Sequence, residues 1–113
     1  MEQVLSSSGG VFIAEDPEGR LIGFAEFSIR IDYVPGADTS PIPFLEGWFV
    51  DENYRAKGVG KELLTAIEDW SQQKGYKQLA SDALLDNTTG IEIHKQLGFL
   101  EIERTVHFIK KLS

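Results

Sequence analysis

Residues 47–64 read GWFVDENYRAKGVGKELL, and this stretch says more about structure than any other part of the sequence. An apolar segment comes first, a short basic loop with two glycines follows, and apolar residues at helical spacing come last. The first N–H groups of a helix have no internal partners, and the aligned peptide dipoles place partial positive charge there. The stretch therefore predicts a strand, an anion-binding loop and a helix.

The loop is suited to a pyrophosphate. Gly58 and Gly60 lack the Cβ atoms that would keep such an anion at a distance. Arg55 and Lys57 add full positive charge beside the exposed amides. We therefore expect a nucleotide-like anion here.

Spacing separates the known phosphate loops. Walker A is excluded, because Arg55 stands at its first glycine and Glu62 at its Ser/Thr position. The dinucleotide fingerprint is disfavoured, because Leu63 stands at its third glycine and the chain is short for a doubly wound domain. Residues 55–60, RAKGVG, match [QR]-x-x-G-x-[GA], which resembles the acetyl-CoA pyrophosphate loop of the GNAT N-acetyltransferase superfamily.

A second motif agrees in order and spacing. Residues 87–99, NTTGIEIHKQLGF, resemble the family pattern N-x-x-A-x-x-x-Y-x-x-x-G-F, with Gly90 in place of Ala and His94 in place of Tyr. The resemblance implies an α/β (α+β) fold with a mostly antiparallel central sheet flanked by helices.

A narrower resemblance lies in residues 22–36, 40–50 and 79–82, which are similar to the aminoglycoside 6′-N-acetyltransferases. The resemblance implies direct transfer of acetyl from acetyl-CoA, as cosubstrate, to a primary amine of an aminoglycoside-like cation. Two alternatives stay open: an enzyme of this fold for another small amine or peptide amine, and a shortened protein that binds acetyl-CoA without catalysis.

Composition limits the function classes. The chain has 113 residues, of which 42% are hydrophobic, and we therefore expect one domain over residues 1–113. No cysteine occurs, which excludes disulfides, thiolate metal sites and a covalent cysteine mechanism; we expect no metal and a cytoplasmic location. A net charge of −7 argues against nucleic acid and favours cationic partners. The short apolar runs predict neither a leader nor a membrane span.

The chain predicts a compact series of elements. Residues 1–10, rich in Ser and Gly, read as a flexible start, and residues 11–14 and 21–31 as a hairpin around a turn at 16–19. Further strands are expected at 44–50, 79–82 and 102–109, a helix from Gly58 to Lys74 that stops at Gly75, and a short helix at 90–97.

Compared with the family pattern, the chain is shortened at its amino end. About ten residues stand where the family has a strand and two helices, which implies a truncated reading frame, a partner subunit that fills the gap, or an open acceptor wall. A single strand is expected after residues 98–99 where the family usually has two. We therefore expect a homodimer, with strand exchange as one way to close it.

Three residues are candidates for the chemistry. Glu46 lies inside an apolar strand, where burial would raise its pKa toward that of a useful base, and Gly47 is expected to mark a bulge. Asp82, at the end of the neighbouring strand, is a candidate to bind the reacting ammonium or share the base role. His94 replaces the Tyr that, in many family members, protonates the departing CoA thiolate.

Each candidate has a structural alternative. For Glu46 the alternative is an exposed strand carboxylate or the partner of an arginine, for Asp82 a cap before the following loop, and for His94 a packing or surface residue.

Binding residues follow from the resemblance together with backbone chemistry. Residues expected to contact acetyl-CoA are Phe49, Val50, Arg55, Lys57, Gly58, Val59, Gly60, Lys61 and Asn87. Residues expected near the acceptor are Asp32, Tyr33, Asp38 and Trp48. The sequence leaves open which amine is acetylated and how a dimer would close.

Overall fold

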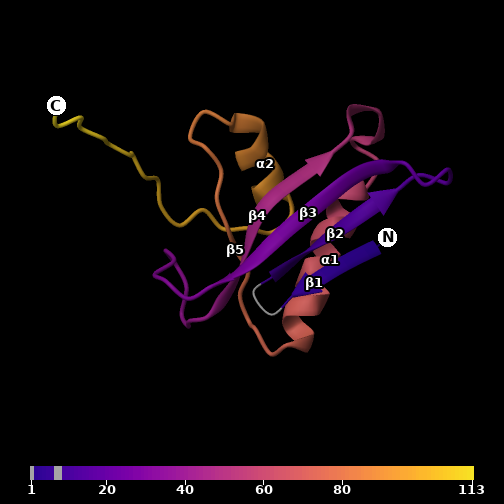
Figure 1. The fold of residues 1–113 in the computed structure, drawn as a ribbon, viewed down its shortest axis with the longest axis horizontal. Helices are drawn as coiled ribbons and strands as arrows, with labels where there is room; N and C mark the ends of the chain where they lie inside the picture. Colours follow the sequence, from indigo (N-terminus) through magenta and orange to yellow (C-terminus); the bar gives the residue numbers. More distant parts are fainter. Residues whose placement is uncertain (1, 7–8) are drawn as a thin grey trace. The chain divides into compact units, whose positions relative to one another are not determined.

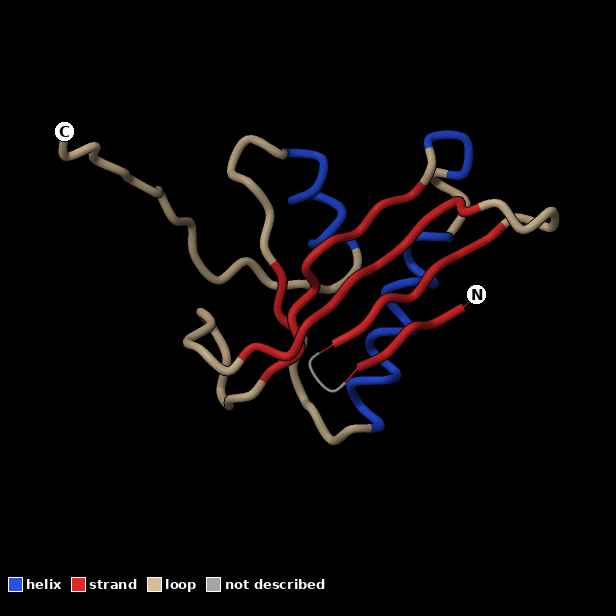
Figure 2. The backbone as a smooth tube through the Cα atoms, viewed as in Figure 1, coloured by secondary structure: helices blue, strands red, loops and turns tan. Residues whose placement is uncertain are grey.

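The computed structural model describes residues 2–6 and 9–113 (Figures 1 and 2). The chain divides into two units, one ending at Asp82 and the other running from Ala83 to Ser113. The first unit holds the sheet and the long helix; the second holds a short helix.

The first unit is built on a five-stranded mixed sheet in the order β1-β2-β3-β4-β5. Neighbouring strands run antiparallel from β1 to β4, and β5 runs parallel to β4. Four antiparallel strands beside one parallel strand confirm the expected fold class. The strands are β1 (Glu2–Ser6), β2 (Gly9–Glu15), β3 (Leu21–Arg30), β4 (Ile42–Val50) and β5 (Ala80–Ser81).

Helix α1 (Val59–Gln73) packs against β2, β3 and β4 on one face of the sheet (Figure 1). Its apolar stripe buries Leu63, Leu64 and Ile67 completely or nearly so. Phe27 of β3 faces them, with its ring centroid 4.8 Å from that of Trp70. Each fully buried large side chain stabilises the fold by roughly 1.5–3 kcal/mol relative to exposure, so this face supplies most of the core.

The carboxyl end of α1 confirms the predicted stop. Gly75 has φ +90°, its N–H donates to Gln72 O at 3.0 Å, and the N–H of Tyr76 donates to Ser71 O at 3.0 Å. These two bonds form a Schellman motif, in which glycine adopts the left-handed conformation without a Cβ penalty.

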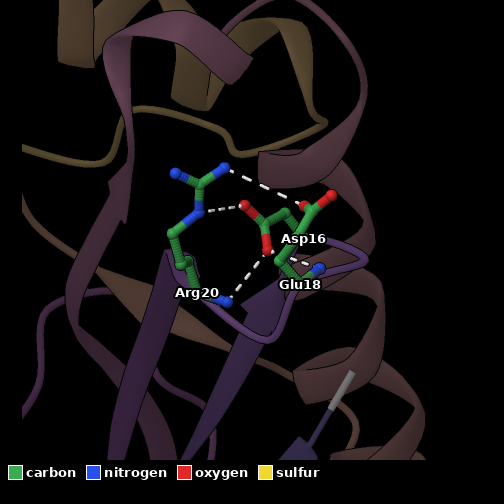
Figure 3. Close-up of polar contacts among 3 residues, drawn as sticks. All are labelled: Asp16, Glu18 and Arg20. Carbon is green, nitrogen blue, oxygen red and sulfur yellow. Dashed lines mark hydrogen bonds and ion pairs between the residues drawn. The ribbon is translucent and has the colours of Figure 1, made fainter.

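The turn between β2 and β3 is organised by Asp16 (Figure 3). Its carboxylate accepts from the backbone N–H groups of Glu18 and Arg20 at 2.9 Å each, and from Arg20 Nε at 2.8 Å. These bonds, the backbone N–H of Arg20 first, hold the pKa of Asp16 below its usual value. The predicted hairpin is confirmed.

The prediction of a flexible start is wrong where the structure describes it, since β1 pairs with β2 and β2 begins at Gly9. Gly9 has φ +147°, and a Cβ there would lie 2.2 Å from the Phe27 carbonyl oxygen. This glycine therefore lets two strands approach each other closely, whereas the Ser and Gly content of residues 1–10 had indicated flexibility. Residues 1, 7 and 8, which belong to the predicted start, lie outside the described residues.

The second unit contains α2 (Thr88–Gln96), which Asn87 caps by accepting from the N–H of Gly90 at 3.0 Å. Gly98 ends this helix, with φ +97° and an N–H bond to Lys95 O.

The predicted strand at residues 102–109 is wrong, because no strand is assigned from Phe99 to Ser113. The alternation of apolar residues is present, but a strand also needs a neighbour for its backbone groups. The apolar side chains of this segment are exposed instead: Leu100, Ile102, Val106, Phe108, Ile109 and Leu112.

Candidate functional site

A β-bulge in β4 falls at Glu46. In the ladder with β3, Glu26 pairs with Gly47 and Phe27 pairs with Leu45, so that Glu46 is the extra residue. An extra residue shifts the phase of side-chain alternation along a strand. The expected bulge beside Gly47 is confirmed.

The phase shift sends Glu46 and Trp48 to opposite faces. Glu46 meets Ser28 and Arg30, whereas the indole N–H of Trp48 donates to the carbonyl of Gly60 in α1 at 3.1 Å. In an uninterrupted strand, residues two apart share a face. The bulge therefore lets one strand present a carboxylate on one side and support the helix start on the other.

Two side chains of β3 hold the Glu46 carboxylate. Arg30 donates through Nη2 to Oε1 at 2.7 Å and through Nε to Oε2 at 2.9 Å, and the Ser28 hydroxyl donates to Oε2. Hydrogen bonds from Arg30 come first among the causes that lower the pKa of Glu46, partly opposed by burial. The expectation that burial would raise this pKa is wrong, because charge and hydrogen bonds to the ionised form outweigh desolvation.

Arg30 is itself fixed on its other side. Its guanidinium carbon lies 3.4 Å from the centroid of the Phe44 ring, a buried residue that packs with Val34 and Ile42. The hydrogen bonds to Glu46 raise the pKa of Arg30 above its usual value, and the charge of Asp82 adds to this. Arg30 thus lies within electrostatic reach of both candidate carboxylates.

The expected acceptor loop between β3 and β4 has one buried anchor. Val34 is 4% exposed in that cluster, whereas Asp32, Tyr33 and Asp38 are exposed. The side chain of Gln78 ties this loop from outside, accepting from Asp38 N–H at 2.8 Å and donating to Gly36 O at 3.3 Å. The loop is positioned from two directions while its polar residues stay accessible.

The loop before α1 follows a short 3₁₀ helix, η1 (Glu52–Tyr54). Gly58 is the N-cap of α1, with φ +87° and no side-chain cap, and Glu62 N–H donates to its carbonyl at 3.0 Å. The N–H groups of Val59, Gly60 and Lys61 come before this hydrogen bond in the chain. Like the first N–H groups of any helix, they have no acceptor within the helix itself. A helix start of this kind presents backbone donors to an anion.

The two basic residues of this loop make local contacts. Arg55 Nε donates to the carbonyl of Val50 at 3.0 Å, which joins the loop to the end of β4. Lys57 Nζ lies 5.6 Å from the centroid of the Tyr54 ring. Both side chains are therefore on the loop that the sequence indicated.

Described pairing between β4 and β5 covers two positions, Phe44 with Ala80 and Leu45 with Ser81. The part of β4 that carries Phe49 and Val50 lies beyond the last of these pairs, on the far side of the bulge. Phe49 is exposed and its ring stacks on Phe24, with centroids 5.9 Å apart. Backbone groups of β4 beyond its last pair with β5 are suited to pairing with the amides of an extended ligand.

The second unit contains the remaining two candidates. Asn87 uses its side-chain oxygen to cap α2, and His94 Nδ1 lies 2.7 Å from the Gly90 carbonyl. Since a carbonyl oxygen only accepts, this contact is a hydrogen bond when Nδ1 carries a proton. The His94 ring also makes an edge contact with Phe99, with centroids 5.0 Å apart.

Sequence reasoning did not single out Arg30, Ser28 or Gln78. The sequence contained a signal for two of these residues. Ser28 and Arg30 are two residues apart on a predicted strand and therefore share a face. Their pairing with Glu46 across strands was not visible locally. In the described part of the chain, no group of His, Asp or Glu is arranged to hold a metal ion.

A family model described as the Acetyltransferase (GNAT) family matches residues 2–99. The chain belongs to this family. Solved structures with the same architecture include AAC(6')-Iy in complex with the bisubstrate analogue CoA-S-monomethyl-acetylneamine, with a TM-score of 0.86 and 43% identity over 94% of this chain and 71% of that chain. A second solved structure, AAC(6')-Ih from Acinetobacter baumannii, matches with a TM-score of 0.86 and 39% identity. The match covers 96% of this chain and 74% of that chain.

Among curated relatives, the chain is 39% identical over 107 residues to an aminoglycoside N(6')-acetyltransferase type 1 of Stenotrophomonas maltophilia, covering 95% of this chain and 70% of that protein. It is 41% identical over 110 residues to the protein of the same name from Salmonella typhimurium, covering 97% and 76%. Both resemblances noted in the sequence are confirmed. None of the helices in the described residues has the length and apolarity needed to cross a membrane.

Proposed function

We propose that this protein transfers an acetyl group from acetyl-CoA directly to a primary amine of an aminoglycoside-like cation. The observation that carries the proposal is the identity of about 40% over nearly the whole chain to relatives named for that reaction. The ionised carboxylate at the β4 bulge supports it, because a cationic acceptor needs a fixed negative partner.

The cofactor side uses main-chain groups and the basic loop. We assign the pyrophosphate to Arg55, Lys57 and the amides of residues 58–61, where a helix start faces solvent. Phe49 and Val50 contribute backbone groups to the pantetheine arm beyond the last β4–β5 pair. Asn87 is assigned a pantetheine amide.

The acceptor side is formed by carboxylates. Glu46 and Asp82 attract and orient the reacting ammonium, and Asp32, Tyr33 and Asp38 on the loop provide further polar contacts with the cation. Trp48 was expected to stack on a sugar ring; its bond to Gly60 supports a second role in holding the helix start.

In the reaction, the bound ammonium first releases one proton to solvent; the free amine then attacks the thioester carbonyl, a C–N bond forms and the C–S bond breaks. The nitrogen becomes acidic as it bonds to carbon, so a carboxylate with a lowered pKa still accepts its proton, directly or through a water. Glu46 has this role in our proposal. His94, as the imidazolium, gives the Nε2 proton to the departing thiolate.

We further propose that both units form one acetyltransferase domain, because the family match runs through both. The exposed apolar residues after Phe99 support a homodimer in which this segment pairs with a second copy. A cysteine-free chain is suited to the reducing cytoplasm, where we place its activity.

The test is an initial-rate assay of CoA thiol release with a 6′-amino aminoglycoside, its 6′-hydroxy analogue, spermidine, or no acceptor. Release with the 6′-amino compound alone supports the proposal. Release with spermidine alone indicates a different amine substrate. Acetyl-CoA binding without release for any amine indicates a binding protein, so binding is measured by calorimetry on the same sample.

A further inference from the structure

We propose that Arg30 is a positioning residue of this site, which holds the Glu46 carboxylate in one orientation for the acceptor ammonium. The proposal rests on the proposed function and adds to it a residue to which the resemblance assigned no role.

The first argument is geometric. Arg30 binds both oxygens of Glu46, at 2.7 and 2.9 Å, which is the bidentate fork that guanidinium and carboxylate form. A single bond would leave the carboxylate free to rotate about it. Two parallel bonds fix the plane of the carboxylate.

The second argument is the support behind the guanidinium. Phe44, 4% exposed, places its ring 3.4 Å from Arg30 Cζ, so that the cation is fixed to the core by its face and to Glu46 by its edge. A series of contacts thus runs from the buried cluster through Phe44 and Arg30 to the partly exposed carboxylate of Glu46. Glu46 is the bulged residue, whose own backbone does not hold its side chain by regular pairing.

The third argument concerns charge. Glu46 contacts Arg30 and Ser28 of β3, and the charge of Asp82, which follows β5, also acts on Arg30. The hydrogen bonds from Arg30 favour the ionised form of Glu46, while side-chain exposures of 40% for Arg30 and 29% for Glu46 leave the pair accessible to a ligand.

Two variants separate orientation from charge. Arg30→Gln removes both, and Arg30→Lys keeps the charge but lacks the planar fork. Arg20→Gln is the matched control, since Arg20 also pairs with a carboxylate but lies at the opposite end of β3. For each protein we would measure kcat and KM with the 6′-amino acceptor, the melting temperature, and the Glu46 carboxyl pKa by NMR, assigned by its absence in Glu46→Gln.

We expect Arg30→Gln to lower kcat by on the order of tenfold to a hundredfold and to raise the pKa of Glu46. In Arg30→Lys, the pKa of Glu46 should again be lowered while kcat stays reduced. In Arg20→Gln, kcat and the pKa of Glu46 should both match those of the wild type. The proposal is overturned if Arg30→Gln melts at a lower temperature but keeps the wild-type kcat and Glu46 pKa, or if Arg30→Lys restores kcat in full.

An inactive wild-type protein would refute the proposed function instead. The NMR titration would still decide whether Arg30 holds the carboxylate: a raised pKa in Arg30→Gln supports this, and an unchanged pKa overturns it.

Discussion

Asp16 and Glu46 are both paired with an arginine, and in both the pairing lowers the pKa of the carboxyl, but the two sites are built differently. The Asp16 side chain is 1% exposed and accepts two backbone N–H groups in addition to Arg20. The hydrogen bonds found for Glu46 come from side chains, those of Ser28 and Arg30.

The difference indicates what each pair can do. Backbone donors in a tight turn cannot be withdrawn without opening the turn, so Asp16 stabilises a fixed structure. The Glu46 side chain is 29% exposed while Arg30 and Ser28 hold it, so in the proposed function its carboxylate can also contact a cationic ligand. A lowered carboxyl pKa therefore accompanies a structural role in one place and a proposed functional role in the other.

Glu46→Gln is expected to have the largest effect on activity. It keeps the shape of the side chain but removes the charge and the base, so kcat should fall on the order of a hundredfold. Acetyl-CoA affinity, measured by calorimetry, should change little. Equal losses in kcat and acetyl-CoA affinity would instead make Glu46 structural and remove the contrast with Asp16.

Asp16→Ala should show the opposite pattern. The backbone N–H groups of Glu18 and Arg20 lose their acceptor, so the melting temperature should fall by a few degrees while kcat stays at the wild-type value. Asp16→Asn is the control, because it retains one acceptor oxygen, and its melting temperature should therefore fall less. A loss of kcat in a well-folded Asp16→Ala protein would contradict the structural role.

The dependence of stability on pH should follow from the lowered pKa of Asp16. Its stabilising contribution is complete above the ordinary carboxyl pKa of 3.8 and is lost as the pH falls through the lower folded-state value. Asp16→Ala should therefore flatten the acid side of the curve of unfolding free energy against pH, as measured by urea denaturation from pH 2 to pH 7. Curves that stay parallel would show that Asp16 is not linked to folding.

Ser28→Ala should have the smallest effect on kcat. It separates the contribution of Ser28 to the Glu46 site from that of Arg30. It removes one of the donors to Glu46 but leaves the Arg30 fork, which keeps the carboxylate ionised and oriented, so kcat should fall only about threefold, less than the full contribution of a hydrogen bond to a charged group. Steady-state kinetics at saturating acetyl-CoA measure this. A loss as large as that of Arg30→Gln would shift the positioning role from Arg30 to Ser28.

The local patterns of the sequence predicted the first unit well. The stop at Gly75 and the start at Gly58 depend on neighbouring residues, and the structure has both. The environment of Glu46 could not be predicted in this way, because Arg30 is sixteen residues away on another strand. A pKa depends on such partners across strands, whereas periodicity reports only the element that contains the residue.

The errors at the two ends have related causes. Gly9 was read as flexible because glycine lacks a side chain, yet that lack is what allows β2 to approach Phe27 so closely. The alternating residues 102–109 were read as a strand because period-two patterning is typical of strands, but the pattern alone supplies no neighbour for the backbone. In both cases a contact distant in sequence decides the outcome.

The bulge in β4 has a consequence for how this strand can change. Glu46 is the one residue between Ile42 and Val50 that the ladder with β3 skips, so a chain lacking it would pair Leu45 and Gly47 with the same partners as before. Trp48 would still face Gly60, and α1 would keep its support. The charged group thus occupies a position that the ladder between β3 and β4 does not use, so its removal or exchange should leave that ladder and the contact of Trp48 with α1 unchanged.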